Sequence, residues 1–140
     1  MNDSLNIALH YLKFRPRSVF EIEKKLKEKK ISEEEIQKTV GVLKKNQLLD
    51  DEKFAKMWVR DRNLLKPEGS YLLKMELKKL GIAENTIEDA LAGQDEEELA
   101  RQALKSKSRL QNADFQKKAS FLQRRGFGTG LIYKVLKNDQ

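Results

Sequence analysis

Cysteine is absent from this 140-residue chain, and His10 is its single histidine. A disulfide framework is therefore excluded. A structural zinc site is excluded as well, because it needs several thiolate or imidazole ligands. Carboxylates alone could bind a hard cation, but none of them has the spacing of an EF-hand loop. We therefore expect no metal and no cofactor.

Long apolar runs are also missing. No stretch of about eighteen apolar residues occurs, which excludes a membrane-spanning helix. The opening residues, MNDSLNIALHYL, lack the basic region, the long apolar segment and the cleavage site of a signal peptide. We therefore expect a cytoplasmic protein without a membrane partner.

Catalytic signals are equally scarce. The sequence has no recognisable nucleophile–base pair and no phosphate-binding loop. The adjacent carboxylates Asp50 and Asp51 precede an apolar helical run, where acids are more often helix caps than catalytic groups. We therefore expect no catalytic residues and no enzymatic activity.

Positive charge is in excess, and it is arranged in blocks. The formal net charge is +7. Residues 13–30 contain eight Lys or Arg and three Asp or Glu. Residues 101–137 contain ten Lys or Arg and one Asp or Glu. Residues 84–98 contain seven acids and no base. The blocks predict opposed faces or ends, with the basic ones facing an anionic partner. A merely solvated helical surface is the alternative for any single block.

Apolar residues follow helical spacing throughout, and only two prolines interrupt the chain. The pattern predicts an all-α fold. Nine helices are expected, at residues 3–14, 17–29, 33–46, 51–64, 69–79, 84–92, 95–107, 114–125 and 129–137.

Capping signals support these helix starts. Two serines are followed three positions later by glutamate, which is the pattern of a capping box: Ser18 with Glu21, and Ser32 with Glu35. Asp50 or Asp51 is expected to cap the fourth helix, and Ser70 the fifth.

Glycines mark two of the expected helix ends. Gly81 and Gly126 stand where a left-handed residue is wanted. Lys30 occupies the same position in an earlier copy of the pattern, so that turn needs backbone strain or another geometry.

One helix–turn–helix pattern occurs three times, in LKEKKISEEEIQKTV, LKKLGIAENTIEDAL and LQRRGFGTGLIYKVL. Apolar residues recur at four equivalent positions: Leu26, Leu77 and Leu122; Ile31, Ile82 and Phe127; Ile36, Ile87 and Ile132; Val40, Leu91 and Leu136. The copies are separated by about 51 and then about 45 residues, which is typical of helical repeat arrays. Agreement at four positions argues against a chance match. We predict a tandem array of three helix-turn-helix-like units, each of three helices, at 1–47, 48–93 and 94–140.

Three motifs in order, LLDDEKFAKMWVRDR, KPEGSYLLKMELKKLGI and FLQRRGFGTGLIYKVL, resemble the RecX family of bacterial regulatory proteins. The likeness runs from about residue 7 to residue 137. Gln47 and Leu48 stand where the family usually has Gly and Tyr. The resemblance implies a non-enzymatic modulator of the RecA recombinase that lies along the groove of the RecA–DNA filament and generally inhibits it. It also implies a role in DNA repair, recombination and the SOS response.

Candidate binding residues fall into three groups. They are Arg15, Arg17 and Lys24 in the first unit, Arg60, Arg62, Lys66 and Lys74 in the second, and Lys117, Lys118, Phe121, Arg124 and Arg125 in the third. Lysine and arginine would contact phosphates without reading sequence. Phe121 either stacks on a base or fills a partner's pocket, or it packs against the seventh helix of its own unit.

Only the third unit offers a helix start suited to phosphate. The last helices of the first two units begin with SEEE and AENTIED, whose acids repel DNA, whereas the third begins with GTGLIYK. Gly128 and Gly130 would permit close backbone approach, or they simply form a turn. Gly69 and Ser70 could offer free amides to a phosphate, with a helix cap as the alternative.

Core residues are also expected from the helical pattern. Phe115, Ala119 and Leu122 share one stripe of the eighth helix. Phe54 and Trp58 share a face of the fourth helix with Ala55, and Arg62 closes that face.

The leading hypothesis is regulation of a RecA-type recombinase filament by a monomeric protein. It predicts weak, sequence-indifferent binding to single- or double-stranded DNA. Inhibition could arise by blocking subunit addition, by bridging subunits or by competing for DNA. The acidic stretch around Glu84, Glu88, Asp89 and 95–98 would face a basic surface of the recombinase. The alternatives are a stand-alone DNA-binding transcription regulator and a protein–protein scaffold.

Overall fold

The computed structural model describes residues 2–138, and every regular element within that range is helical. The elements are α1 (Asn2–Phe14), α2 (Val19–Glu28), α3 (Glu33–Lys45), α4 (Asp51–Leu65), α5 (Ser70–Lys79), α6 (Glu84–Leu91), α7 (Glu96–Lys105), the 3₁₀ helix η1 (Ser108–Leu110), α8 (Phe115–Arg124) and α9 (Thr129–Asn138). The nine predicted helices are confirmed, with ends that differ by a residue or two. The η1 turn was not predicted.

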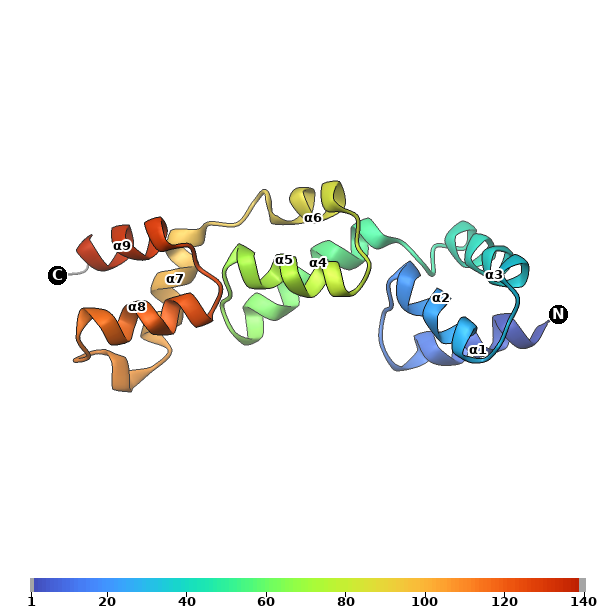
Figure 1. Cartoon of the computed structure of the whole chain (residues 1–140), viewed down its shortest axis with the longest axis horizontal. Coiled ribbons are helices and arrows are strands. Elements are labelled where there is room, and N and C mark those ends of the chain that lie inside the picture. The colour runs from blue at the N-terminus through green and yellow to red at the C-terminus, as the bar shows by residue number, and fades with distance from the viewer. Residues whose placement is uncertain (1, 139–140) are drawn as a thin grey trace.

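Three helical units follow one another in a row, with the two ends of the chain at opposite ends of the molecule (Figure 1). Unit one contains α1–α3, unit two α4–α6, and unit three α7–α9. Each unit has its own cluster of buried apolar residues. The predicted tandem array of three-helix units is therefore confirmed. The exact unit boundaries stay a prediction, and residues 1, 139 and 140 of the outer units lie outside the described range.

The repeated apolar positions form the three cores. Leu26, Leu77 and Leu122, which are equivalent in the repeat, are all 0% exposed. At the third equivalent position, Ile36, Ile87 and Ile132 are also buried. Burial of one such side chain stabilises the fold by about 1.5–3 kcal/mol, so each unit is held mainly by its own small core.

The turn between the last two helices of each unit uses a left-handed residue. Gly81 has φ 78° and Gly126 has φ 90°, as expected for glycine after a helix. Lys30 keeps the same turn at φ 61°, so the first unit accepts backbone strain instead of changing geometry. Gln47 is also left-handed, at φ 62°.

Most of the predicted caps are present. Ser18 and Glu21 form the complete capping box at the start of α2. Ser32 Oγ accepts a hydrogen bond from the Glu35 amide, which is the first half of the second expected box. Asp50 caps α4 by accepting from the amides of Glu52 and Lys53.

The predicted Ser70 cap is wrong. Gly69 is the N-cap residue of α5 and makes no side-chain cap. Ser70 starts the helix, and its amide and hydroxyl both donate to Glu96, at 3.0 Å and 2.9 Å. The amide of Gly69 donates to the Arg125 carbonyl at 2.7 Å. Neither amide is therefore available to a phosphate, so that part of the prediction is wrong too.

Units one and two meet through the loop that precedes α2. Ser18 Oγ donates to the Leu80 carbonyl at 2.6 Å, and the Val19 amide donates to Asp51 Oδ1 at 2.9 Å. Phe20 packs directly over Gly81, where a Cβ atom would collide with its side chain. The first joint is thus built from two polar contacts and one close approach.

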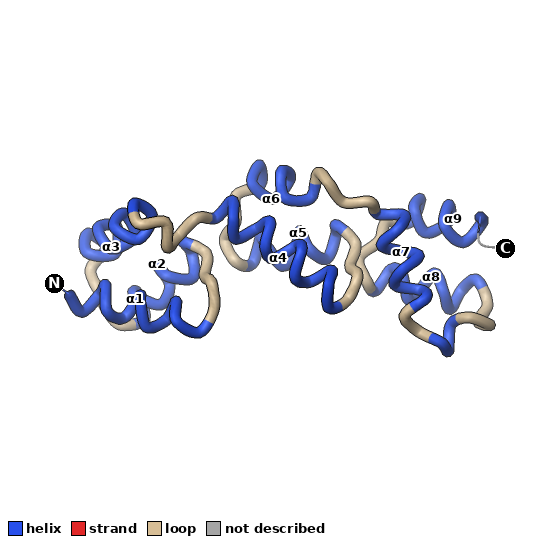
Figure 2. The backbone as a smooth tube through the Cα atoms, turned by 180° about the vertical axis from the view of Figure 1, so that it is seen from behind, coloured by secondary structure: helices blue, strands red, loops and turns tan. Residues whose placement is uncertain are grey.

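Units two and three meet in the same way. The loop between α4 and α5 lies beside the loop between α8 and α9 (Figure 2). The Tyr71 amide donates to the Gly126 carbonyl at 3.2 Å, next to the bond between Gly69 and Arg125. A Cβ atom on Gly126 would lie 2.5 Å from that of Leu72, so glycine is required by packing as well as by φ. Because the chain repeats its joint, neighbouring units take a defined orientation.

Within residues 2–138, no helix combines the length and the apolar character needed to cross a bilayer.

Candidate nucleic-acid interface

The basic residues of the third unit do not share one environment. Arg124 and Lys117 are exposed, and Lys118 is half-buried. Arg125 is only 7% exposed, its guanidinium lies 4.7 Å from the centre of the Phe121 ring, and its Nη1 donates to the Pro67 carbonyl at 3.1 Å. Burial lowers the pKa of Arg125, and the charge of Glu68 partly opposes that shift. Arg124 and Arg125, which the sequence grouped as candidate binding residues, therefore differ in environment, because Arg125 belongs to the joint.

Phe121 is 4% exposed and belongs to the core of unit three with Leu122. It packs inside its own unit, so it is not available to stack on a base in this structure. Phe115, by contrast, was expected in the core but is 40% exposed and meets the ring of Tyr133 edge-on at 6.0 Å. The prediction for α8 therefore had these two aromatics the wrong way round: Phe121 is buried, and Phe115 is exposed.

The basic residues of the second unit are largely paired. Arg62 Nη2 lies 2.8 Å from Glu76 Oε2, and this hydrogen bond raises the pKa of Arg62. Arg60 contacts Asp61 at 3.2 Å, and Lys74 contacts Glu84 at 3.0 Å. Lys66 is exposed and makes no ion pair with the described residues. Lys66 is therefore the member of this group that no carboxylate of the described residues pairs.

The core prediction for α4 is confirmed. Phe54 and Ala55 are buried, and the Trp58 ring stacks on Phe54 with a centroid distance of 5.8 Å. The Trp58 indole N–H donates to Glu76 at 3.0 Å, and the Arg62 guanidinium lies 5.4 Å from the ring centre.

In the first unit, the Glu21 carboxylate forms ion pairs with two arginines. Arg15 forms an ion pair with Glu21, and Arg17 lies 3.6 Å from the same carboxylate. The Arg17 guanidinium also covers the Tyr11 ring at 3.7 Å. Lys24 is exposed, and the structure gives it no ion pair within the described range.

The twelve predicted binding residues therefore divide by environment. Lys24, Lys66, Lys117, Lys118 and Arg124 are accessible and unpaired among the described residues. Arg15, Arg60, Arg62 and Lys74 are accessible but paired, and Arg17, Phe121 and Arg125 serve the packing. Whether the accessible residues bind nucleic acid stays a prediction.

The acidic stretch is partly used inside the protein. Glu84 pairs with Lys74 and Lys78, and Glu97 pairs with Arg101 and with Lys134 of α9 at 2.7 Å. Asp95 caps α7. Glu88 and Asp89 remain exposed and form no ion pair in the described part of the chain. These two are the acids most available to a basic partner.

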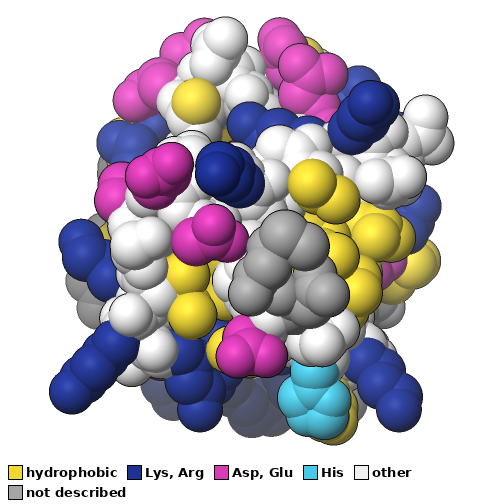
Figure 3. All heavy atoms as spheres, turned by 90° about the vertical axis from the view of Figure 1, so that its right-hand side faces the viewer, with side chains coloured by type: hydrophobic (Ala, Val, Ile, Leu, Met, Phe, Trp, Pro, Cys, Tyr) yellow, Lys and Arg dark blue, Asp and Glu magenta, His cyan; other side chains and the backbone are white. Residues whose placement is uncertain are grey.

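Sequence reasoning missed a groove in unit one, between α1 and α2. Tyr11, Lys25 and Lys29 line it together with His10 and Phe14 of α1. The pairs His10 and Phe14, and Lys25 and Lys29, are each spaced four residues apart, which places each pair on one helix face. That spacing could have indicated the groove. The space-filling view shows the end of unit one, where acidic and basic side chains are intermixed with exposed apolar ones (Figure 3).

No group of three or more His, Asp or Glu residues within 2–138 is arranged to hold a metal ion.

Substitutions at Arg124 and Arg125 should have different effects, one on nucleic-acid binding and the other on stability. Arg125→Ala should lower the free energy of unfolding by about 1–3 kcal/mol, because the Pro67 carbonyl loses its donor inside the joint. Arg124→Glu should leave stability within about 0.5 kcal/mol, but should weaken nucleic-acid binding and reduce its salt dependence by about one phosphate contact. Urea unfolding and fluorescence anisotropy measure the two effects. Equal stability losses for both variants would contradict the division.

A buried carboxylate at the second joint predicts a pH dependence. Glu68 is 4% exposed, and its Oε1 finds no hydrogen-bond partner among the described residues. Burial raises the pKa of Glu68 above its ordinary value of 4.5, Glu76 raises it further, and Arg62 opposes the shift. The folded protein therefore binds more protons than the unfolded chain between the two pKa values. The associated stability is complete below the unfolded pKa and is lost as the pH rises through the folded pKa.

Glu68→Gln should remove that loss. Between pH 4.5 and pH 7, the wild type should lose stability relative to Glu68→Gln, as measured by urea unfolding at each pH. Glu88→Gln, at an exposed acid without an ion pair, is the control and should follow the wild type. Parallel pH profiles for the wild type and Glu68→Gln would contradict the prediction.

The fold and its charged surface define a helical-repeat protein made of helix-turn-helix-like units. Residues 5–43 match the family model for "RecX, first three-helix domain", and residues 50–91 match that for "RecX, second three-helix domain". The chain belongs to the RecX family of regulatory proteins.

Individual relatives agree. The Regulatory protein RecX of Chlorobaculum tepidum is 36% identical over 97% of this chain and 88% of its own length. That of Thermotoga sp. (strain RQ2) is 39% identical, over 94% of this chain and 81% of the relative. Other curated relatives are longer, and the chain spans 52% of the Geobacillus sp. protein, which is 33% identical. The crystal structure of RecX from Lactobacillus salivarius matches with a TM-score of 0.86 at 26% identity, over 98% of this chain and 94% of that chain.

Proposed function

We propose that this protein modulates a RecA-type recombinase by binding the recombinase–DNA filament, and that it inhibits the filament's activity. Membership of the RecX family of regulatory proteins is the observation that carries this proposal. The protein acts as a binding partner and not as an enzyme, and it belongs to the control of DNA repair and recombination in the cytoplasm, including the SOS response.

The shape of the molecule supports binding to an extended partner. Three units with defined joints form an elongated row, and each carries an accessible lysine or arginine without an ion pair, such as Lys24, Lys66 and Arg124 (Figure 1). A row of separate cations suits a repeating anionic surface, because each contributes a phosphate contact at a different place. Such contacts bind single- or double-stranded DNA weakly and without sequence preference.

The acidic side of unit two supports a protein contact in addition. Glu88 and Asp89 lie on α6, are exposed and form no ion pair of their own in the described chain, so they are suited to a basic patch of the recombinase. Neutralising both with Glu88→Gln and Asp89→Asn should weaken inhibition without weakening binding to naked DNA.

The test is recombinase ATP turnover on single-stranded DNA at physiological salt, with this protein titrated as a monomer and naked-DNA binding measured in parallel. Inhibition below the concentration that coats naked DNA supports a target on the filament. Lys66→Glu and Arg124→Glu should raise the concentration needed for inhibition. Lys38→Glu, at an exposed lysine already paired with Glu34, is the control.

Inhibition only where naked DNA is saturated would contradict the proposal and leave competition for phosphate. Saturable preference for a particular duplex sequence would instead indicate the alternative, a stand-alone transcription regulator.

A further inference from the structure

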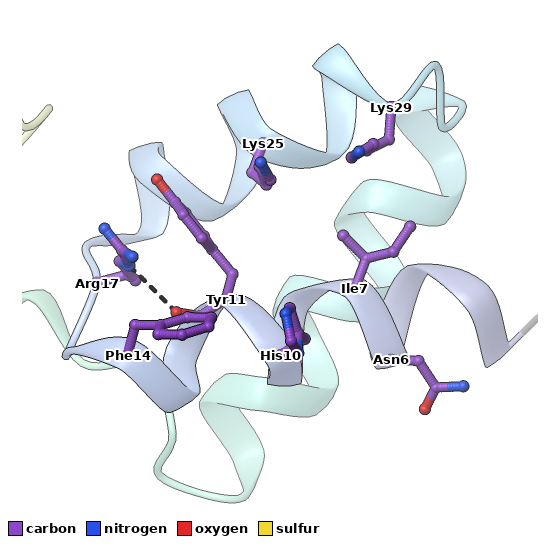
Figure 4. A pocket seen from close by; sticks show the side chains of 8 residues that line it. All are labelled: Asn6, Ile7, His10, Tyr11, Phe14, Arg17, Lys25 and Lys29. Carbon is purple, nitrogen blue, oxygen red and sulfur yellow. Dashed lines mark hydrogen bonds between the residues drawn. The ribbon is translucent and has the colours of Figure 1, made fainter.

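A groove of about 640 Å³ opens between α1 and α2 of unit one. Ile7 and Tyr11 form its apolar floor, with His10 and Phe14 beside them on α1. Lys25 of α2 and Lys29, which directly follows α2, face them (Figure 4). Arg17 lies at one end of the groove, where its Nε donates a hydrogen bond to the Tyr11 carbonyl at 3.3 Å. The groove thus combines aromatic walls on one helix with cations on the other.

The equivalent groove is filled in unit two. The offset that aligns Leu26 with Leu77 places Ile7 on Trp58 and Lys25 on Glu76. Trp58 and Glu76 are hydrogen-bonded to one another, so a large ring and its acceptor occupy the space between the two helices.

Unit three fills the same space differently. The offset that aligns Leu77 with Leu122 places Glu76 on Phe121, which is buried under the guanidinium of Arg125. Unit one has a lysine at this position and no large ring at the Trp58 position, and its groove is open. The opening is therefore a property of unit one and not a general consequence of the repeat.

The residues that line the open groove include an exposed aromatic ring and lysines without ion pairs in the described chain. Phe14 is 69% exposed and meets the His10 ring edge-on at 5.1 Å, which leaves aromatic surface accessible. Lys25 Nζ lies 5.2 Å from the centre of the Tyr11 ring. Lys25 and Lys29 form no ion pair with residues 2–138. Arg17 is already held by Glu21, so the two lysines supply the available charge.

We propose that this groove binds one unstacked nucleotide of single-stranded nucleic acid. The base lies against Ile7 and the rings of His10 and Phe14, since Arg17 covers the Tyr11 ring, and the adjoining phosphates lie at Lys25 and Lys29. An aromatic surface accepts any base, and two unpaired cations match consecutive phosphates. A duplex keeps its bases stacked and paired, so it cannot fill the groove in this way. The inference rests on the proposed nucleic-acid contact and assigns its base-binding part to unit one.

The experiment compares three fluorescent ligands of equal length at one salt concentration: oligothymidylate, an abasic oligomer that keeps the phosphates, and a duplex. Anisotropy should show that the full-length protein binds oligothymidylate about tenfold more tightly than the abasic oligomer, since one stacked base contributes about 1–3 kcal/mol. A 2-aminopurine placed in the oligothymidylate should change its fluorescence on binding.

Two sets of variants separate base from phosphate. His10→Ala with Phe14→Ala removes exposed rings and should abolish the preference over the abasic oligomer. Tyr133→Ala, at a 60% exposed ring in unit three, should preserve that preference. Lys25→Glu with Lys29→Glu should weaken all single-strand binding and reduce the salt slope by about 1.4, at roughly 0.7 per phosphate. Lys27→Glu, on the same helix and outside the groove, should have a smaller effect. Far-UV circular dichroism verifies that each variant is folded.

Equal affinity of the wild type for oligothymidylate and the abasic oligomer would overturn the proposal, as would an equal loss with Lys27→Glu and Lys25→Glu. Displacement by an acidic peptide with the same lysine dependence, in the absence of any base preference, would assign the groove to a protein partner instead. These assays contain no recombinase. A negative result here with intact inhibition of ATP turnover would therefore reject the groove and retain the proposed function.

Discussion

Gly126→Ala is expected to lower the free energy of unfolding by about 2 kcal/mol or more. Alanine must adopt φ near 90°, which is strained for a residue with a Cβ atom. That atom would also lie 2.5 Å from the Cβ of Leu72 and 2.7 Å from its amide nitrogen, so the joint must shift. Urea unfolding followed by circular dichroism measures the loss.

Gly41→Ala is the matched control. Gly41 lies inside α3, and a Cβ atom there would meet nothing within 4 Å. Alanine has the higher helix propensity, so this variant should gain about 0.5–1 kcal/mol. Hydrogen exchange should place the Gly126→Ala loss in α5, α8 and α9, on both sides of the joint. A loss confined to α9 would show that the joint tolerates the added atom and that only the turn is strained.

Leu77→Ala is expected to have the largest effect of a side-chain truncation, about 2–5 kcal/mol. Leu77 is 0% exposed in the core of unit two, next to Leu73 and Ile87, and its removal leaves a cavity among them. Leu65→Ala removes the same atoms at the end of α4, where the side chain is 83% exposed, and should change stability by about 0.5 kcal/mol or less.

The position of the loss is as informative as its size. Because each unit buries its own core, Leu77→Ala should first reduce amide protection in α4–α6. Amide protection in the two outer units should fall less, and only to the extent that they depend on their joints with unit two. Uniform loss of protection along the chain would contradict separate cores and indicate one cooperative unit.

Local signals predicted the helices, and distant partners account for what was missed. Ser18 and Asp50 cap helices as expected because their acceptor and donor groups lie within three residues. Ser70 has the same local signal, but Glu96, 26 residues away in the next unit, takes its amide and hydroxyl. Nothing near Ser70 in the sequence indicates that contact.

The same limit applies to the candidate interface. Residue type and helical stripe identified the cations, but not which of them meet carboxylates. Arg62 and Glu76 are fourteen residues apart, and Arg125 reaches Pro67 across 58. The sequence grouped Phe121 with Arg125 as candidate binding residues, and the two do lie in contact, yet residue type could not show that both are buried. The burial of Phe121 depends on the core of its own unit, and that of Arg125 depends on the joint with unit two.

The turn at Lys30 has a consequence for association between copies of the chain. At Gly81 and Gly126, the absence of a side chain makes room for Phe20 and Leu72 of the preceding unit. Lys30 has the same left-handed backbone but carries a full side chain, so the surface of unit one is obstructed where a preceding unit would seat. We therefore expect that identical molecules do not join head to tail by repeating the internal joint, because the Lys30 side chain would lie where the preceding unit must pack.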